Sequence, residues 1–216
     1  MIGGKEYKHV VWDWNGTLVN DVEFCVDILN GILRDLSLSQ ITVELYREKF
    51  SFPVYDFYVA LGWDRTGMSF EEISNAFVNA YWSDWKKCDL HSNVSFLITG
   101  LHNKGLTQSI LSASKQEPLE GFVRHYDLEV YLNDCIGIKD QYAHGKIDEG
   151  KAWIEKSEFK EDEILMIGDT VHDFEVAQEM GIDCVLIADG HNSVERLNTC
   201  GVPVFQSLEE LEILVK

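Results

Sequence analysis

Apolar residues in this chain alternate between short strand-like runs and longer stretches in which they recur every three or four positions. The short runs predict buried strands, and the spaced stretches predict amphipathic helices. The strand-like segments lie at residues 9–13, 107–112, 164–169, 184–188 and 202–205, with a weaker one between 130 and 138. The segment at 202–205 contains Pro203, which predicts an edge strand because proline has no backbone N–H to donate to a neighbouring strand.

One long stretch interrupts this alternation. Between about residues 20 and 91 the apolar spacing is helical, apart from a loop-like segment at 62–67. Ser69, followed by Glu71 and Glu72, predicts a capped helix start after that segment. The stretch therefore predicts a helical insertion after the first strand, not a separate terminal domain.

Length and composition agree with one core domain and a smaller insert. A chain of 216 residues with 45% hydrophobic residues can bury a sizeable core. Strands separated by helices predict βαβ units and a mostly parallel sheet. We therefore expect an α/β fold, with a Rossmann-like, doubly wound core at 1–19 and 96–216 and an all-helical insert at 20–95.

The charge balance limits which ligands the protein attracts. A total of 18 Lys and Arg against 37 Asp and Glu gives a net charge of −19, which argues against nucleic-acid binding and docking on anionic membranes. The same charge repels a polyanionic substrate at long range. A phosphate ligand must therefore be held by local donors or by a metal ion.

Cysteine usage and the N-terminus favour a cytoplasmic protein. The five cysteines are odd in number, scattered and without CxxC spacing, which is typical of reduced thiols and not of disulfides or a zinc site. The first residues lack the apolar region of a signal peptide. No apolar run approaches the roughly 20 residues that span a bilayer.

Polar side chains follow the predicted strands at their carboxyl ends. Asp13 ends the first strand and precedes Asn15-Gly16-Thr17, Ser112 ends the second, Lys146 precedes a helix, and a later strand runs into Gly168–Asp173. Each alone has an ordinary interpretation, such as a helix N-cap, a turn hydroxyl or a surface charge. Their occurrence together at successive strand ends favours a shared site, because those ends converge on one crevice of the sheet.

This set of residues resembles the haloacid dehalogenase superfamily of phosphohydrolases, in its phosphoglycolate phosphatase-like branch with a helical cap after the first motif. The resemblance covers nearly the full chain, from His9 to about Leu211. It implies that Asp13 attacks phosphorus and forms an aspartyl-phosphate, which splits one hard hydrolysis into two easier steps. The implied substrate is a small phosphate ester, phosphoglycolate by analogy alone.

The resemblance also implies a magnesium ion. Its ligands would be the Asp13 and Asp169 carboxylates and the backbone carbonyl of Asn15, with Asp173 as a further or water-mediated ligand. Mg²⁺ prefers oxygen ligands and retains some waters, which suits this set. The ion would offset the repulsion between an anionic nucleophile and an anionic phosphate.

Other residues of the set would bind the phosphoryl group. The resemblance implies that Ser112, with the adjacent Ala113, contacts the phosphoryl oxygens. Backbone amides around Gly16 and Thr17 would complete the phosphate cradle.

A lysine would complete the site. The resemblance implies that Lys146 keeps Asp13 ionised and neutralises charge in the transition state. Lys151 is the competing candidate, but it falls inside the helix that follows.

Position 15 departs from the family pattern. Relatives carry an aspartate there, which protonates the leaving oxygen and then deprotonates the attacking water, help that is worth about 10²–10⁴-fold. The amide of Asn15 cannot exchange protons usefully near neutral pH, so we expect a slow phosphohydrolase that favours good leaving groups such as acyl phosphates or phenols. His172 or His191 could supply the proton transfer, or could simply orient a loop or an aspartate.

Two further interpretations stay open. A regulatory protein could keep the phosphate and metal pocket without turnover. The same nucleophile could also serve another reaction. A dehalogenase would use Asp13 on carbon without a metal, and the pair of Asp169 and Asp173 argues against that reaction. A phosphonatase would need a lysine from the cap, for which Lys49 is the candidate.

The insert is rich in aromatic residues, most of which must form the core of a small helical bundle. In capped relatives such an insert closes over the phosphate and excludes water. Arg65, between the helical halves, could reach a substrate carboxylate or a second phosphate, or could remain a solvated surface charge. Phe52 and Pro53 are further candidates for facing the substrate.

Overall fold

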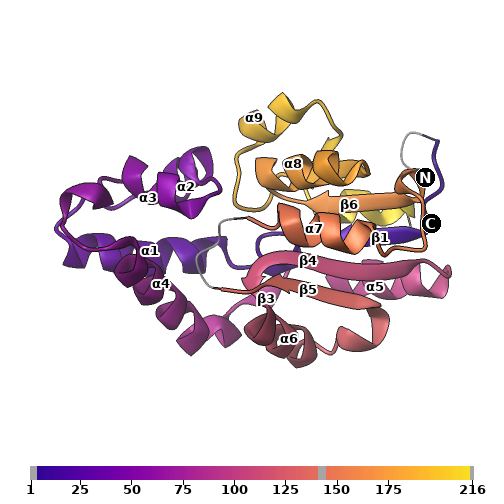
Figure 1. Ribbon diagram of the computed structural model, residues 1–216, viewed down its shortest axis with the longest axis horizontal. Coiled ribbons are helices and arrows are strands. Elements are labelled where there is room, and N and C mark those ends of the chain that lie inside the picture. The colour runs from indigo at the N-terminus through magenta and orange to yellow at the C-terminus, as the bar shows by residue number, and fades with distance from the viewer. Residues whose placement is uncertain (1–3, 141–144, 215–216) are drawn as a thin grey trace.

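The computed structural model describes residues 4–140 and 145–214. Within this part of the chain, six strands form one sheet in the order β5-β4-β1-β6-β7-β8, and all neighbouring strands are parallel (Figure 1). The strands are β1 His9–Trp12, β4 Thr107–Lys115, β5 Asp134–Ile138, β6 Ile164–Gly168, β7 Asp183–Ile187 and β8 Val204–Phe205. The expected α/β fold with a doubly wound parallel sheet is confirmed.

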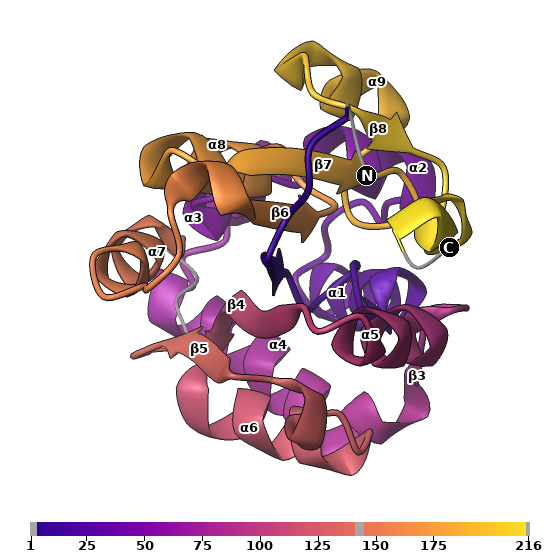
Figure 2. The same cartoon turned by 90° about the vertical axis from the view of Figure 1, so that its right-hand side faces the viewer.

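Helices cover both faces of the sheet because side chains alternate along each strand (Figure 2). Val10 and Trp12 of β1 pack into a core shared with α5 and α6, whereas Val11 packs into a second core shared with α7 and α8. The helices of the core domain are α5 Val94–Asn103, α6 Gln116–His125, α7 Ile147–Ile154, α8 Val171–Met180 and the short α9 Val194–Leu197.

Two strands differ from the sequence prediction. Strand β4 runs to Lys115, three residues beyond the expected end, with an irregular register after Leu111. Strand β5 begins only at Asp134, because residues 129–131 form a 3-10 helix and Val130 is 71% exposed. The third strand therefore lies within the predicted segment 130–138 but occupies only its second half.

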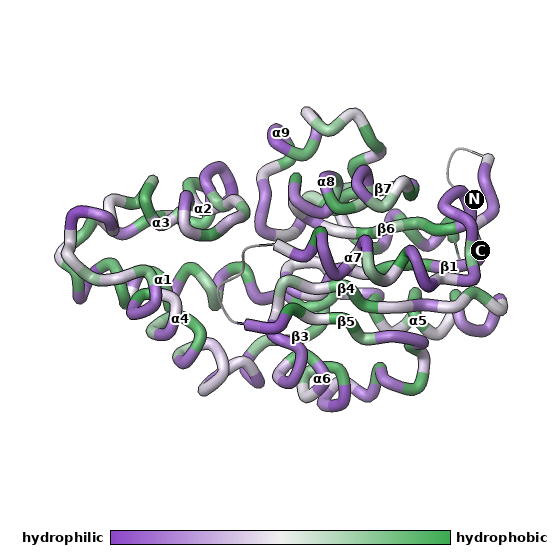
Figure 3. Tube along the Cα trace, viewed as in Figure 1, coloured by the Kyte–Doolittle hydropathy of each residue, from purple (hydrophilic) through white to green (hydrophobic). Residues whose placement is uncertain are grey.

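The connection between β1 and β4 carries the predicted helical region. Its helices are α1 Val22–Asp35, α2 Val43–Lys49, α3 Val54–Ala60 and α4 Phe70–Asp84, which project from one end of the sheet (Figure 1). Ser69 caps α4 as predicted, since its hydroxyl accepts the Glu72 N–H and the Glu72 carboxylate accepts the Ser69 N–H. Apolar segments follow the strands of the sheet, whereas apolar and polar segments alternate along these helices (Figure 3).

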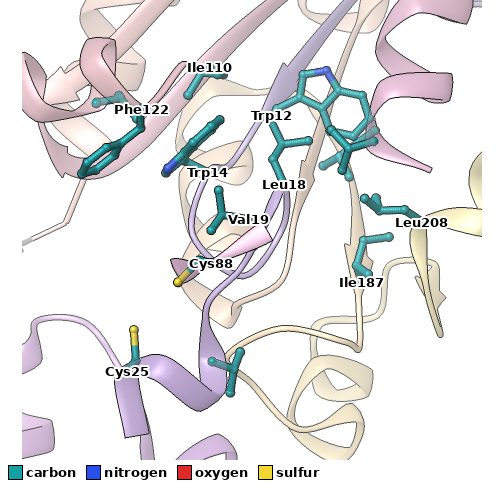
Figure 4. Packing of buried hydrophobic residues seen from close by; sticks show 14 of the residues in the cluster. Trp12, Trp14, Leu18, Val19, Cys25, Cys88, Ile110, Phe122, Ile187 and Leu208 are labelled. Carbon is teal, nitrogen blue, oxygen red and sulfur yellow. The ribbon is translucent and has the colours of Figure 1, made fainter. Parts of the chain in front are cut away.

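The helical region leaves and rejoins the core at a single place. Strand β2, Val19–Asn20, pairs antiparallel with β3, Asp89–Leu90. Beside this pair, Trp14 and Leu18 are fully buried in the core that also contains Cys88 and Phe122 (Figure 4). Indole and leucine side chains removed from water at this point fix the start of the insertion against the sheet.

None of the described helices is long and apolar enough to cross a bilayer. All five cysteines are free thiols, as their scattered positions predict.

His9 is a buried histidine at the start of β1. Its ring contacts those of Trp153 and Phe159, each with its centroid 5.1 Å away, and its Nδ1 is 2.6 Å from the Thr107 hydroxyl. The Nε2 atom is buried and finds no hydrogen-bond partner among the described residues. Burial lowers the pKa of His9 to about 4, because the charged ring is poorly solvated there.

This histidine predicts a loss of stability in acid. The unfolded chain binds the His9 proton near the ordinary pKa of about 6.5, so stability is full above that pH and falls as the pH drops toward 4. At pH 5 the loss is about 2 kcal/mol. His9→Phe keeps the ring contacts, and we expect it to exceed the parent protein in free energy of unfolding at pH 5, measured by urea denaturation. His125→Phe is the control, and equal pH profiles for His9→Phe and the parent would contradict this account.

Candidate active site

The carboxyl ends of the three central strands bring the polar residues together. Strand β1 lies between β4 and β6, so Asp13 after β1 lies between Ser112 in β4 and Asp169 after β6. Asp173 lies in the first turn of α8, where its carboxylate accepts N–H bonds from Asp169 and Thr170 at 3.1 and 2.9 Å. The strand-end residues therefore form one cluster, as the sequence pattern suggested.

Lys146 lies at the centre of this cluster. It immediately precedes α7, and its side chain is 2% exposed. Its ammonium donates to Asp13 Oδ1, to Asp173 Oδ1 at 2.7 Å and to the Leu111 carbonyl at 2.7 Å. These three acceptors match its three N–H donors. The competing candidate, Lys151, instead forms a surface ion pair with Glu179.

Burial and charge act on the three carboxylates in different ways. Burial raises the pKa of Asp13 well above its ordinary value, although Lys146 opposes the shift. Burial likewise raises the pKa of Asp169 to about 6. For Asp173, the Lys146 ammonium and the Thr170 hydroxyl outweigh the effect of burial and lower the pKa. The cluster thus contains more negative charge than its own lysine can balance.

The cluster fits a divalent cation. The carboxylate oxygens of Asp13, Asp169 and Asp173 all lie within 4.8 Å of one another. Three ionised carboxylates and one ammonium leave a net charge of −2, which one divalent ion balances. Oxygen donors of this kind are the ligands that Mg²⁺ prefers.

Asp169 is held in place by hydrogen bonds and by two glycines. The Thr17 hydroxyl and the His191 N–H each donate to its carboxylate at 2.6 Å. A Cβ atom on Gly190 or on Gly16 would overlap the same carboxylate, and Gly16 also has a φ of +78° that disfavours larger residues. The Gly-Thr turn after β1 therefore orients the Asp169 carboxylate, which follows β6.

The structure places the predicted phosphate-binding residues in two groups. Ser112 and Ala113 line the cavity beside Asp13, and the Ser112 Oγ accepts the Ser114 N–H at 3.0 Å. Gly16 and Thr17 are not among the described cavity-lining residues. The Gly16 N–H donates to Asp21 at 3.0 Å, and the Thr17 hydroxyl is used on Asp169.

Asn15 is fixed by three partners. Its amide NH₂ donates to Asp21 Oδ2 at 2.7 Å and to the Tyr81 hydroxyl at 2.8 Å, while its amide oxygen accepts from the Ser114 hydroxyl at 2.7 Å. The Tyr81 hydroxyl in turn donates to Asp21 at 2.8 Å. The side chain that replaces the usual aspartate is thus oriented by an acidic residue behind it.

Asp21 is the residue that the sequence pattern did not reveal. It is fully buried and pairs with His191, whose Nε2 lies 3.2 Å from its carboxylate. Burial opposes charge on His191, but Asp21 and the neighbouring carboxylates outweigh it and raise the His191 pKa to about 9. The same contact contributes to a lowered pKa for Asp21. A polar residue at the start of a predicted helix is ordinary, so this position carried no special signal.

Both histidines considered for proton transfer use their ring nitrogens elsewhere. His191 contacts Asp21 through Nε2 and the Tyr46 hydroxyl through Nδ1 at 2.9 Å. In His172, Nε2 accepts the Lys146 backbone N–H at 3.2 Å and Nδ1 lies 3.1 Å from Glu175. These contacts correspond to the structural alternative, in which the rings orient loops and an aspartate.

A cavity joins this cluster to helices α1–α4. Its lining includes Asp13, Asn15 and Lys146 on one side and the side chains of those helices on the other. Phe52 lines it, and Phe52 also stacks on His172 with ring centroids 4.8 Å apart. Arg65 and Lys49 are both exposed and are not among the described lining residues.

The comparisons with known proteins decide the family. Residues 10–187 match the model of the haloacid dehalogenase-like hydrolases. The chain belongs to this family. The resemblance of its strand-end motifs is thereby confirmed at the level of the family, and the helical region of this hydrolase lies between β1 and β4.

Solved structures share the same fold. A predicted phosphoglycolate phosphatase from Haemophilus somnus superposes with a TM-score of 0.77 at 16% identity, covering 99% of this chain and 100% of the other. The Mycobacterium tuberculosis protein tyrosine kinase A superposes with a TM-score of 0.79 at 20% identity, covering 98% and 99%. In sequence, tyrosine-protein kinase PtkA from Mycobacterium tuberculosis H37Rv is 21% identical over 96% of this chain and 72% of its own length.

Proposed function

We propose that this hydrolase is a magnesium-dependent phosphatase that acts on a small phosphate ester through a covalent aspartyl-phosphate on Asp13. The observation that carries the proposal is the buried cluster in which Lys146 joins Asp13 to Asp173 with Asp169 alongside. A nucleophilic carboxylate, an ammonium and a divalent-ion site in contact are the parts that phosphoryl transfer requires.

The proposed reaction has two steps. An Asp13 oxygen bonds to phosphorus while the bond from phosphorus to the ester oxygen breaks, and the alcohol leaves with the electron pair and takes up a proton. Water then attacks the aspartyl-phosphate, which frees inorganic phosphate and restores the carboxylate. Lys146 holds Asp13 in its charged form and stabilises the developing charge. Mg²⁺, held by Asp13, the Asn15 backbone carbonyl, Asp169 and Asp173, would neutralise phosphoryl oxygens.

The environment of Asn15 supports slow or selective turnover. Its amide hydrogens are committed to Asp21 and Tyr81, so this residue offers no titratable proton to the leaving oxygen. Esters whose leaving groups need little protonation should therefore react best. Ser112 and Ala113 would bind the phosphoryl group from β4.

Helices α1–α4 are proposed as the cap, with the core at 1–19 and 96–216. Arg47 of α2 donates to the Gly190 carbonyl at 2.8 Å, and Asn192 donates to the Phe50 carbonyl at 3.0 Å, which ties this region to the loop after β7. Such contacts close the cavity over Asp13 and exclude water. Free thiols throughout the chain support a place in the reducing cytoplasm.

Trapping the phosphoenzyme tests the proposal. Acetyl phosphate is added with Mg²⁺, the reaction is quenched in acid, and the phosphorylated peptide is located by mass spectrometry. We expect hydroxylamine-labile phosphate on Asp13 that disappears with EDTA and in Asp169→Asn. A protein that binds Mg²⁺ but never forms a phosphoenzyme would instead be a regulatory phosphate-binding member of the family.

A further inference from the structure

One face of α4 extends the cavity away from the catalytic cluster. Ser74, Phe77, Val78, Tyr81 and Trp82 all line the cavity, at the spacing of a single helix face. The Tyr81 hydroxyl contacts Asn15, whereas Ser74 lies two turns earlier, or about 10 Å along the helix axis. This face therefore runs from the reacting end of the cavity into the helical region.

The opposite wall is also apolar. It is formed by aromatic and aliphatic side chains from α1, α3 and the segments next to α2, which are Leu29, Phe50, Phe52, Val54 and Phe57. Among the described lining residues, helices α1–α4 and the connections between them contribute no charged side chain, and Asp21, at the N-cap position of α1, is paired with His191. A carboxylate placed here would lose its hydration without gaining a cation, which is costly.

Ser74 provides a polar group within these walls. Its side chain is 3% exposed, and its Oγ atom has no hydrogen-bond partner among the described residues. A buried hydroxyl without a partner is unfavourable, and a ligand atom at that point would relieve the cost. The cavity thus combines apolar walls with a buried hydroxyl that has no partner among the described residues, at a distance from Asp13.

The size of the cavity limits its occupant. Its volume is about 170 Å³, close to that of an engineered apolar cavity of about 150 Å³ that binds benzene. Because the same space also includes the region beside Asp13 where the phosphoryl group would bind, it favours a leaving group of at most about one ring over a nucleoside or a long chain.

We propose that the leaving group of the substrate is an uncharged single aromatic ring, with a hydroxyl or similar polar substituent that reaches Ser74. This rests on the proposed phosphatase function and assigns its substrate class: phosphate monoesters of phenols or benzyl alcohols. Phosphoglycolate, whose leaving group carries a carboxylate, does not match these walls. Within the described lining, the charged basic residues besides Lys146 are His191, which pairs with Asp21, and Lys115 of the core, whose ammonium lies 5.9 Å from the Trp82 ring centroid.

Binding of two matched phosphonates tests this assignment without catalysis. Benzylphosphonate and phosphonoacetate differ only in carrying a ring or a carboxylate beyond the same CH₂ group. With Mg²⁺ present, we expect benzylphosphonate to bind about 10–100-fold more tightly by calorimetry, the effect of burying one ring. Three results would overturn the assignment: equal affinity for the two compounds, tighter binding of phosphonoacetate, or binding of neither compound. Tighter binding of phosphonoacetate could arise through Lys115.

Turnover separates a failure of this inference from a failure of the proposed function. Benzyl phosphate and phosphoglycolate both release primary alcohols, so their ratio of kcat/KM reports recognition of the ring. We expect benzyl phosphate to be favoured about 10–100-fold. A phosphoenzyme that hydrolyses phosphoglycolate faster would preserve the phosphatase and refute the aromatic leaving group.

Two variants locate the contacts. Val78→Lys places an ammonium in the cavity and should invert the preference toward phosphonoacetate. Ser74→Ala should remove the advantage, about 10-fold, of 4-hydroxybenzylphosphonate over benzylphosphonate. Phe96→Ala, an exposed position on α5, is the matched control and should change neither ratio. Thermal melting establishes that each variant is folded, and unchanged ratios in folded variants would place the ring elsewhere.

Discussion

Asp13→Asn is expected to lower phosphate release by about 10⁴–10⁶-fold, because no covalent intermediate can form. The same change should not destabilise the metal-free protein. Burial raises the pKa of Asp13, which means that its ionised form is costly in this cluster. The amide has the shape of the neutral acid and can still accept a hydrogen bond from Lys146.

Two measurements on the same preparation check this prediction. Phosphate release is followed with benzyl phosphate and Mg²⁺, and the free energy of unfolding is taken from urea denaturation with EDTA. We expect activity to disappear while stability is unchanged or higher. Asp64→Asn, at an exposed position, is the control. Activity within tenfold of the parent would exclude Asp13 as the nucleophile.

Restoring the usual aspartate at position 15 is expected to need a second change. In Asn15→Asp alone, the new carboxylate would replace an amide that now donates to Asp21 at 2.7 Å. Two carboxylates at that distance cannot both stay ionised, so one of them would retain a proton. The rate of alkyl phosphate hydrolysis should therefore rise less than about tenfold in the single variant.

The double variant Asn15→Asp with Asp21→Asn moves the negative charge without adding one. The new amide at position 21 can donate to the introduced carboxylate, while its oxygen can still accept from His191. We expect hydrolysis of alkyl phosphates to rise about 10²–10⁴-fold, the value of a general acid–base.

Single-turnover and steady-state rates with benzyl phosphate measure this gain. Asp21→Asn alone is the control, and it should lower stability without accelerating the reaction because it leaves the His191 charge without its partner. A folded double variant that is no faster than the parent would show that Asn15 does not limit turnover.

The sequence predicted those parts of the site that follow strands. Asp13, Ser112 and Asp169 each end or follow an apolar run, and parallel strands bring such positions to one edge of a sheet. Lys146 could be chosen over Lys151 because Lys151 falls inside the helix that follows.

Contacts between distant elements could not be predicted in this way. Asp21 contacts Asn15 in the turn after β1, Tyr81 of α4 and His191 in the loop after β7. These segments meet only in the folded protein. For Arg65 the sequence left a substrate contact and a solvated surface charge both open, and the side chain is exposed and not among the described lining residues. Neither outcome follows from apolar spacing, which reports burial of a face and not its neighbours.

The antiparallel pairing of β2 with β3 has a consequence for how the molecule can be rebuilt. Val19 lies opposite Leu90, so the chain departs from the core and returns to it at neighbouring points. Insertions whose two ends are adjacent are tolerated because they leave the host chain path intact. The β2–β3 pair is therefore a natural graft junction. The helical segment between these two strands could be exchanged for that of a relative while β1 and the nucleophile after it keep their place.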